Sequence, residues 1–167
     1  MAKIAGAIVI GGGVMGASIL YNLALKGVRN SILLERDTIG SGSTGRSSGA
    51  IRMHYSTEVN AKLAHVSLEV FSNFDQVVGG EVGFVNTGYM VFAPKESEQA
   101  FFENIAMQQS VGIDTEVVSI SEAAAIAPAF RLGESEYFAW ESSSGYADPS
   151  ATTSSYLPPK EGAMFRS

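Results

Sequence analysis

The stretch Ile8–Gly27, IVIGGGVMGASILYNLALKG, joins an apolar run to a cluster of glycines and then to a helix-forming segment. Lys3–Ile10 is rich in β-branched residues, which is typical of a buried parallel strand. A helix is expected over Val14–Lys26, because glycine, here Gly27, commonly follows the last helical turn. Ser31–Arg36 is a second apolar strand. The order strand, helix, strand predicts one βαβ unit.

The glycines Gly11, Gly13 and Gly16 have G-x-G-x-x-G spacing. The first allows a tight turn, the second lets a pyrophosphate approach the backbone, and the third lets the helix pack on the strand. The helix N-terminus then offers free N–H groups to phosphates. Glu35 lies 19 residues beyond Gly16, where an acid can bind a ribose. The residues expected to contact a dinucleotide here are Gly11, Gly13, Val14, Met15, Gly16, Glu35 and Arg36.

Two alternatives stay open for this unit. Glu35 can be an ordinary surface carboxylate, and the motif alone does not separate FAD from NAD. An acid at this position disfavours NADP, because it repels the 2′-phosphate. The next stretch, DTIGSGSTGRSSGAIRMHYS (residues 37–56), reads as a flexible linker by its glycine and serine content. Its tight attachment to the second strand, and the presence of Arg46 and Arg52 among apolar residues, favour an ordered loop.

The rest of the chain predicts a second domain inserted into the nucleotide-binding one. A long helix is expected over Thr57–Val78, ended by Gly79–Gly80. Its apolar residues at helical spacing are Leu63, Val66, Val70, Phe74 and Val77. Two short strands are expected around the turn Asn86–Gly88, closed by Pro94. Further expectations are helices over Lys95–Val111 and Ser121–Ile126, strands over Thr115–Val118 and Tyr137–Trp140, a helix starting at Asp148–Pro149 and meeting Pro158–Pro159, and a last strand in GAMFRS.

Composition excludes several classes of protein. The net charge of −6 and the absence of basic runs argue against a nucleic-acid partner. The chain has no cysteine, which excludes disulfides and thiol chemistry. Its two histidines, His54 and His65, lie eleven positions apart and are interpreted as packing or surface residues, so no metal site is expected. Glycines and polar residues interrupt the N-terminal apolar run, which predicts a cytoplasmic protein without a membrane span.

Three stretches carry a resemblance to a known family. They are GSGSTGRSSGAIRMHYS (residues 40–56), FVNTGYMVFAP and WESSSGYADPSATTSSYL. Together with the glycine motif they resemble the D-amino-acid oxidase/glycine oxidase superfamily of FAD-dependent oxidoreductases, over about Ile4–Leu157. The branch that looks most similar holds sarcosine oxidase β-subunits, dimethylglycine dehydrogenase and proline dehydrogenases of that type. The resemblance implies an α/β fold in which part of a mixed-sheet α+β substrate domain interrupts a Rossmann-like FAD-binding unit.

The resemblance also implies roles for individual residues. Ser43, Thr44, Arg46, Ser47 and Ser48 would line the flavin and its pyrophosphate, with FAD held non-covalently, since no histidine occurs at positions 43–45. Hydroxyl and backbone N–H groups suit phosphate oxygens and ring carbonyls. Arg52 matches the position where relatives bind the substrate carboxylate, a role that suits a guanidinium. A structural salt bridge is the alternative for Arg52, and no role is matched for His54.

The resemblance implies a function and also shows how far the chain departs from the family. The implied reaction is oxidation of the C–N bond of an amino acid or a secondary or N-methylated amine, sarcosine-like or proline-like, by hydride transfer to flavin. The chain looks incomplete, because family members are several hundred residues long. The expected parts are an FAD-binding part (1–80), a partial substrate domain (81–145) and a truncated return to the FAD-binding domain (146–167).

Two rival functions follow from the same residues. One is a non-catalytic fragment or subunit that needs a second polypeptide or self-association, and that binds only the ADP part of a dinucleotide. The other is an NAD-dependent dehydrogenase, which would leave the loop from Ser43 to Arg52 without a role. The sequence does not identify the electron acceptor or the amine.

Overall fold

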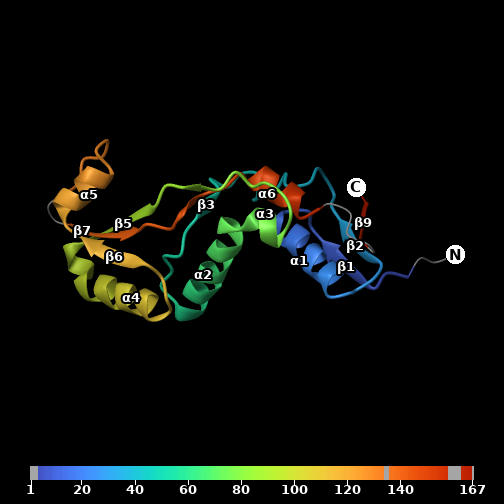
Figure 1. The fold of residues 1–167 in the computed structure, drawn as a ribbon, viewed down its shortest axis with the longest axis horizontal. Coiled ribbons are helices and arrows are strands. Elements are labelled where there is room, and N and C mark those ends of the chain that lie inside the picture. The colour runs from blue at the N-terminus through green and yellow to red at the C-terminus, as the bar shows by residue number, and fades with distance from the viewer. Residues whose placement is uncertain (1–3, 134–135, 158–162, 167) are drawn as a thin grey trace. The chain divides into compact units, whose positions relative to one another are not determined.

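The computed structural model describes residues 4–133, 136–157 and the backbone of 163–166. The chain forms two compact units (Figure 1). The first unit comprises residues 1–50, 73–83 and 147–167, and the second comprises residues 51–72 and 84–146. The domain boundaries expected from the sequence stay predictions. Residues 51–72, which the sequence assigns to the FAD-binding part, lie in the second unit.

The first unit contains the predicted βαβ arrangement. Strand β1 (Ala7–Ile10), helix α1 (Val14–Leu25) and strand β2 (Ser31–Leu34) follow one another, and the strands pair in parallel with Ala7 opposite Ser31. Both strands are shorter than expected, since Ile4–Gly6 and Glu35–Arg36 lie outside them. The predicted end of α1 is confirmed. Gly27 has a φ of +77°, the left-handed conformation that glycine adopts without strain.

The C-terminal part of the chain completes this unit. Strand β9 (Ala163–Arg166) pairs in parallel with β2, which confirms the strand expected in GAMFRS and gives the order β1-β2-β9. Helix α6 (Pro149–Ser155) starts as predicted, because the Asp148 carboxylate accepts hydrogen bonds from the backbone of Ser150 and Ala151. The helix ends before the Pro158–Pro159 pair, which lies outside the described residues.

Aromatic packing joins the segments of the first unit that are distant in sequence. Helix α3 (Phe74–Val77) is capped by Val78, whose carbonyl oxygen accepts a hydrogen bond from the Tyr21 hydroxyl of α1 at 3.2 Å. The Tyr156 ring makes edge-to-face contacts with Tyr21 at 5.5 Å and with Phe74 at 5.2 Å. Such pairs contribute about 0.5–1.5 kcal/mol beyond area burial. Residues 73–83 therefore belong with α1 and α6.

The second unit contains two small sheets. Strand β7 (Glu136–Glu141) pairs antiparallel with β5 (Tyr89–Pro94) on one side and with β6 (Thr115–Val118) on the other. Strands β3 (Ala50–Ile51), β8 (Gly145–Tyr146) and β4 (Val85–Asn86) form the other sheet in that order. The fold class expected from the sequence, α/β with a Rossmann-like βαβ unit interrupted by part of a mixed-sheet α+β domain, is confirmed.

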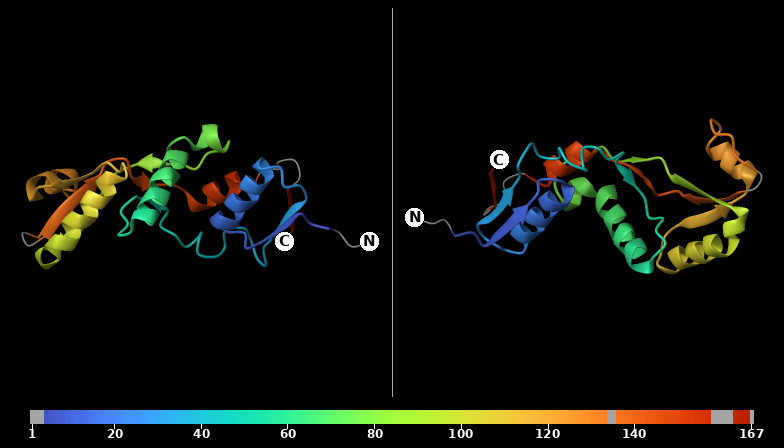
Figure 2. Two further views of the ribbon diagram at one scale, coloured as in Figure 1. Left: turned by 90° about the horizontal axis from the view of Figure 1, so that it is seen from below. Right: turned by 180° about the vertical axis from the view of Figure 1, so that it is seen from behind.

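Helices cover the larger sheet of the second unit. Helix α4 (Glu98–Ser110), preceded by the 3₁₀ turn η1 (Lys95–Ser97), runs beside the sheet, and the two views of Figure 2 show it along β6 and β7. Phe101 and Ile105 of α4 pack on Ala139 of β7. Helix α5 (Ile120–Ile126) begins with a capping box between Ser119 and Glu122. No helix in the described part of the chain is long and apolar enough to cross a membrane. The cytoplasmic location stays a prediction.

The expectation of a single long helix is wrong. The long helix expected over Thr57–Val78 is two helices, α2 (Glu58–Ser72) and α3, separated at Asn73. Of the apolar residues at helical spacing, Leu63 and Val66 are 63% and 57% exposed on α2. The buried face consists of Ala61 and Leu68, which pack with Met53 and Ile113.

The strands β4 and β5 exist as predicted but do not form a hairpin. Strand β4 pairs with β8, and β5 pairs with β7. The turn between them is held instead by a hydrogen bond from the backbone N–H of Gly88 to the carbonyl oxygen of Ser144. Gly88 has a φ of +70°, and its backbone lies against the Trp140 ring. Strand β8 is too short for its two-residue pairing to be recognised in the sequence.

Candidate functional site

The glycine motif forms a tight turn between β1 and α1. Gly11 has a φ of +105°, and a Cβ atom there would point into open space. A Cβ atom on Gly16 would lie 1.9 Å from the carbonyl oxygen of Gly11, so only glycine fits at this helical position. Gly13 is the N-cap of α1 and has no side-chain cap. The geometry supports a tight turn at Gly11 and close packing at Gly16, and the approach of a pyrophosphate at Gly13 stays a prediction.

Glu35 contacts the glycine turn directly. One carboxylate oxygen accepts a hydrogen bond from the backbone N–H of Gly12 at 2.6 Å, and the other accepts one from Asp37 N–H at 3.0 Å. These bonds, with that to Gly12 the stronger, lower the pKa of Glu35 below its ordinary value of 4.5. Glu35 is therefore an ionised acceptor at neutral pH. Each of its oxygens keeps a further lone pair for a hydroxyl group.

The Gly/Ser-rich loop is bonded to the same turn and is not a free linker. The backbone N–H of Gly40 donates to the carbonyl oxygen of Gly12 at 2.9 Å. The Thr44 hydroxyl accepts a hydrogen bond at 3.1 Å from the N–H of Val14, the first residue of α1. A Cβ atom on Gly13 would lie 2.9 Å from this hydroxyl oxygen. Thr44 therefore occupies the helix N-terminus, where the sequence predicts a phosphate contact.

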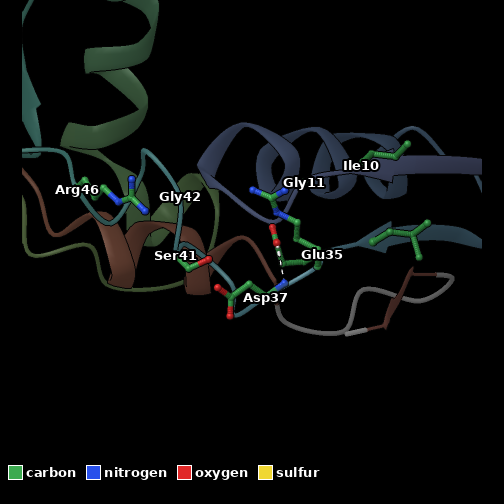
Figure 3. Close-up of a pocket in the computed structure, with 9 residues that line it drawn as sticks. Ile10, Gly11, Glu35, Asp37, Ser41, Gly42 and Arg46 are labelled. Atoms are coloured by element: carbon green, nitrogen blue, oxygen red, sulfur yellow. Dashed lines mark hydrogen bonds between the residues drawn. The ribbon is translucent and has the colours of Figure 1, made fainter.

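A cavity of about 430 Å³ opens between the glycine turn, the end of β2 and this loop (Figure 3). Four of the predicted site residues line it: Gly11, Glu35, Arg36 and Arg46. The other lining residues are Ile10, Leu34, Asp37, Ser41 and Gly42. Figure 3 shows Arg46 at one end and Ile10 at the other, with Ser41, Asp37 and Glu35 between them. The volume is within the range of about 300–1,000 Å³ that is usual for ligand pockets.

The remaining predicted residues of the first unit do not line this cavity. Met15 is exposed in the first turn of α1. Ser43, Ser47 and Ser48 are exposed in the loop, and the Ser47 hydroxyl accepts a hydrogen bond from Gly49 N–H. Asp37 and Ser41 line the cavity but were not expected from the sequence. Their only sequence signal is their place directly after the second strand, where ligand-binding loops of α/β sheets lie.

Arg52 lies in the second unit, directly after β3. Its guanidinium carbon is 4.7 Å from the centre of the Tyr55 ring and 5.5 Å from that of Tyr89. An Nη atom donates a hydrogen bond to the carbonyl oxygen of His54. Among the described residues, no ion pair joins Arg52 to a carboxylate. The salt bridge considered as the alternative role is therefore absent from this part of the chain.

Both histidines of the second unit contact neighbouring side chains. His54 lies 3.6 Å from the Glu141 carboxyl group, and His65 contacts the Met53 sulfur at 3.4 Å and Glu69 at 3.8 Å. Within the described ranges, no three histidine or acidic side chains are grouped so as to hold a metal ion.

The family model for FAD-dependent oxidoreductases (DAO) matches residues 7–157. The chain belongs to this family. The chain is 33% identical over 107 residues to 4-methylaminobutanoate oxidase (formaldehyde-forming) of Paenarthrobacter nicotinovorans, which covers 62% of the chain and 13% of that protein. It is 27% identical over 150 residues to mitochondrial sarcosine dehydrogenase of Mus musculus, covering 89% of the chain and 16% of that protein.

The solved structures agree with this assignment. L-proline dehydrogenase from P. horikoshii superposes with a TM-score of 0.88 at 29% sequence identity, over 99% of the chain and 44% of that structure. The chain thus spans less than half the length of each of these three relatives. The resemblance inferred from the residues is confirmed at the level of family and fold.

Proposed function

We propose that the chain is part of an FAD-dependent oxidoreductase that oxidises the C–N bond of an amino acid or a secondary amine. The family is FAD-dependent, and the three relatives described above are named for a methylamino acid, sarcosine and proline. The observation that carries the amino-acid part is Arg52, a cation between two tyrosine rings with no carboxylate partner among the described residues. Such a guanidinium suits a bidentate substrate carboxylate.

Residues of the first unit are proposed to hold the ADP part of FAD. Glu35 would accept hydrogen bonds from a ribose, while the N-terminus of α1 and Arg46 would face the pyrophosphate. Gly11 and Gly42 have open space at their Cβ positions, which leaves room for a ligand against the backbone. The flavin-side contacts proposed from the sequence are Ser43, Thr44, Arg46, Ser47 and Ser48. Bound FAD would supply the hydride acceptor.

A visible spectrum of the purified chain tests this function. We expect flavin absorption, either as isolated or after FAD is added, and bleaching when sarcosine or proline is added without air. Acid denaturation should release all of the flavin into the supernatant, because the attachment is proposed to be non-covalent. A parallel titration with NADH tests the NAD alternative. A folded chain that stays colourless with excess FAD would disprove the proposal for this chain alone.

A second candidate function is that the chain binds another polypeptide and does not turn over substrate alone. Its exposed apolar side chains favour this candidate. Ile8 and Ile10 project from the same face of the edge strand β1 and are 59% and 85% exposed. In the second unit, Val59, Leu63 and Val66 form an exposed stripe on α2. Contiguous exposed apolar groups commonly mark interaction surfaces. Self-association of a folded, colourless chain in sedimentation would support this candidate.

The ionisation of Glu35 gives a pH prediction. Its pKa is lowered on folding, so its contribution to stability is present above the unfolded pKa, near 4.5, and is lost as the pH falls through the lowered value. Glu35→Gln should therefore unfold at a lower temperature than the unchanged protein at pH 7, and the difference should shrink below about pH 4.5. Thermal unfolding at several pH values measures this. Glu96→Gln, an exposed residue of η1, is the control, and a difference independent of pH would contradict the prediction.

A further inference from the structure

A group of buried and half-buried polar side chains in the second unit contacts the residues that follow Arg52. The function proposed above gives these side chains no role. The group comprises Glu141 and Ser144 at and after the end of β7, Asn104 and Gln108 on α4, and His54, and is called the Glu141 cluster below. Glu141, Gln108 and Ser144 are completely buried. Burying polar groups costs free energy unless they are hydrogen-bonded, so a cluster of this kind calls for a specific reason.

Glu141 is bonded to the segment that follows Arg52. Its Oε2 accepts hydrogen bonds from the backbone N–H of Met53 at 3.0 Å and from the Ser144 hydroxyl at 2.8 Å. Its Oε1 faces the Nδ1 of His54 at 3.6 Å, and neither atom has a hydrogen-bond partner among the described residues. The Asn104 amide nitrogen lies 3.1 Å from the other ring nitrogen of His54. An amide donor there places the ring proton of neutral His54 on Nδ1, toward Glu141.

Every residue from Met53 to Tyr55 is therefore joined to a buried side chain. The backbone N–H of Met53 donates to Glu141, the His54 ring lies 3.1 Å from the Asn104 amide nitrogen and faces Glu141, and the carbonyl oxygen of Tyr55 accepts a hydrogen bond from the Gln108 amide at 3.2 Å. The Arg52 guanidinium is in turn bonded to the carbonyl oxygen of His54 and lies over the Tyr55 ring. The direction of the guanidinium thus depends on a backbone segment that the Glu141 cluster fixes.

We propose that Glu141 is a positioning residue that fixes Arg52 for a substrate carboxylate by holding Met53 and His54. This inference rests on the proposed function, in which Arg52 binds that carboxylate. Glu141 does not touch the substrate. Misplacement of a binding group by about 1 Å can cost 100-fold in rate, so a buried anchor of this kind has a measurable effect at the site.

Paired ligands provide the first test. The unchanged chain, supplied with FAD, is titrated by calorimetry with proline and with prolinamide, which lacks the carboxylate. Glu141→Gln, which keeps the shape of the side chain but changes the group facing His54, should weaken proline binding roughly 10- to 100-fold, by analogy with groups that orient metal-binding residues. Prolinamide binding should change little. Glu116→Gln, an exposed residue of β6, is the matched control.

Nitrogen-15 NMR provides a second readout that needs neither substrate nor activity. In the unchanged chain, we expect a protonated Nδ1 on His54 and a slowly exchanging guanidinium signal from Arg52. In Glu141→Gln, the Arg52 signal should broaden or exchange faster while the unfolding temperature of the second unit is kept. If that variant does not fold, Ser144→Ala is used, because it removes one hydrogen bond to Glu141 Oε2. It should broaden the Arg52 signal or speed its exchange to a smaller extent.

The outcomes separate this inference from the proposed function. If the unchanged chain and Arg52→Met bind proline equally, the proposed role of Arg52 is wrong, and the NMR comparison alone then decides whether Glu141 orders the guanidinium. If Arg52→Met loses proline binding while Glu141→Gln keeps both the affinity and the Arg52 signal, the proposed function stands and the inference about Glu141 is wrong. Equal losses for proline and prolinamide in Glu141→Gln would show a general structural role and would also overturn it.

Discussion

Gly16→Ala should weaken FAD binding about fivefold or more while most of the fold is retained. The added Cβ atom would lie 1.9 Å from the carbonyl oxygen of Gly11 and 3.4 Å from a Val9 methyl group. Backbone atoms cannot move aside as a side chain can, so α1 must shift away from the glycine turn. Overpacking of this kind costs about 1–3 kcal/mol, and 1.4 kcal/mol corresponds to a factor of ten in affinity.

The shift also changes the surroundings of the cofactor site. The first turn of α1 carries the Val14 N–H that donates to Thr44, and Gly12 carries the N–H that donates to Glu35. Both groups lie beside the cavity proposed to bind the ADP part of FAD. Quenching of FAD fluorescence on titration measures the affinity, and thermal unfolding measures the stability.

Gly27→Ala separates loss of stability from loss of binding. Gly27 lies at the other end of α1 with a φ of +77°, and a Cβ atom there would meet nothing within 4 Å. An alanine in this conformation costs about 1–2 kcal/mol. We therefore expect a comparable loss of stability from Gly27→Ala with FAD affinity unchanged. Equal loss of affinity in both variants would show that binding follows overall stability, and the proposed role of Gly16 would be wrong.

The sequence is sufficient to predict the first unit because its signals are local. The strand, the glycine turn, the helix end at Gly27 and the N-cap at Asp148 each depend on residues within one or two turns of one another. The family assignment rests on the same contiguous motifs. Glu35 could be identified from its spacing, although its hydrogen bond to Gly12 could not.

The sequence did not correctly predict the features that depend on contacts between distant segments of the chain. The buried face of α2 is the one that packs on Met53 and Ile113, and both of these residues lie outside the helix. The spacing of apolar residues within the helix therefore does not identify this face, and Leu63 and Val66 are exposed. The partners of β4 and β5 lie more than forty residues away in the sequence, so the turn between these strands resembles a hairpin without being one.

Glu141 gives no sequence signal either. In the sequence it is a polar residue at the end of a predicted strand. Its hydrogen bond to the backbone N–H of Met53, 88 residues away, is visible only in the structure. Thr44 was expected to contact the cofactor, but its bond to the N–H of Val14 also requires the loop to fold back on α1. The site is thus predictable where its residues are neighbours in sequence, and it becomes visible only in the structure where they are not.

Arg52→Met should remove most of the affinity for an amino-acid substrate and leave cofactor binding unchanged. Methionine keeps the unbranched apolar stem between the Tyr55 and Tyr89 rings and removes the charge. Losing one partner of a hydrogen-bonded charge pair costs about 2–5 kcal/mol, which corresponds to a roughly 30-fold or greater rise in Kd or KM. The amide analogue of the same substrate has no carboxylate to lose, so its affinity should fall by much less.

The matched control is Arg29→Met, which removes an exposed arginine of the first unit and changes the net charge by the same amount. It should leave substrate affinity unchanged, because it alters the net charge of the chain without removing the group proposed to bind the carboxylate. Arg52→Lys keeps the charge but not the planar fork, and intermediate affinity is expected from it. If Arg52→Met binds proline and sarcosine as tightly as the unchanged chain does, the guanidinium serves only to pack against the two tyrosines, and the carboxylate site must be sought elsewhere.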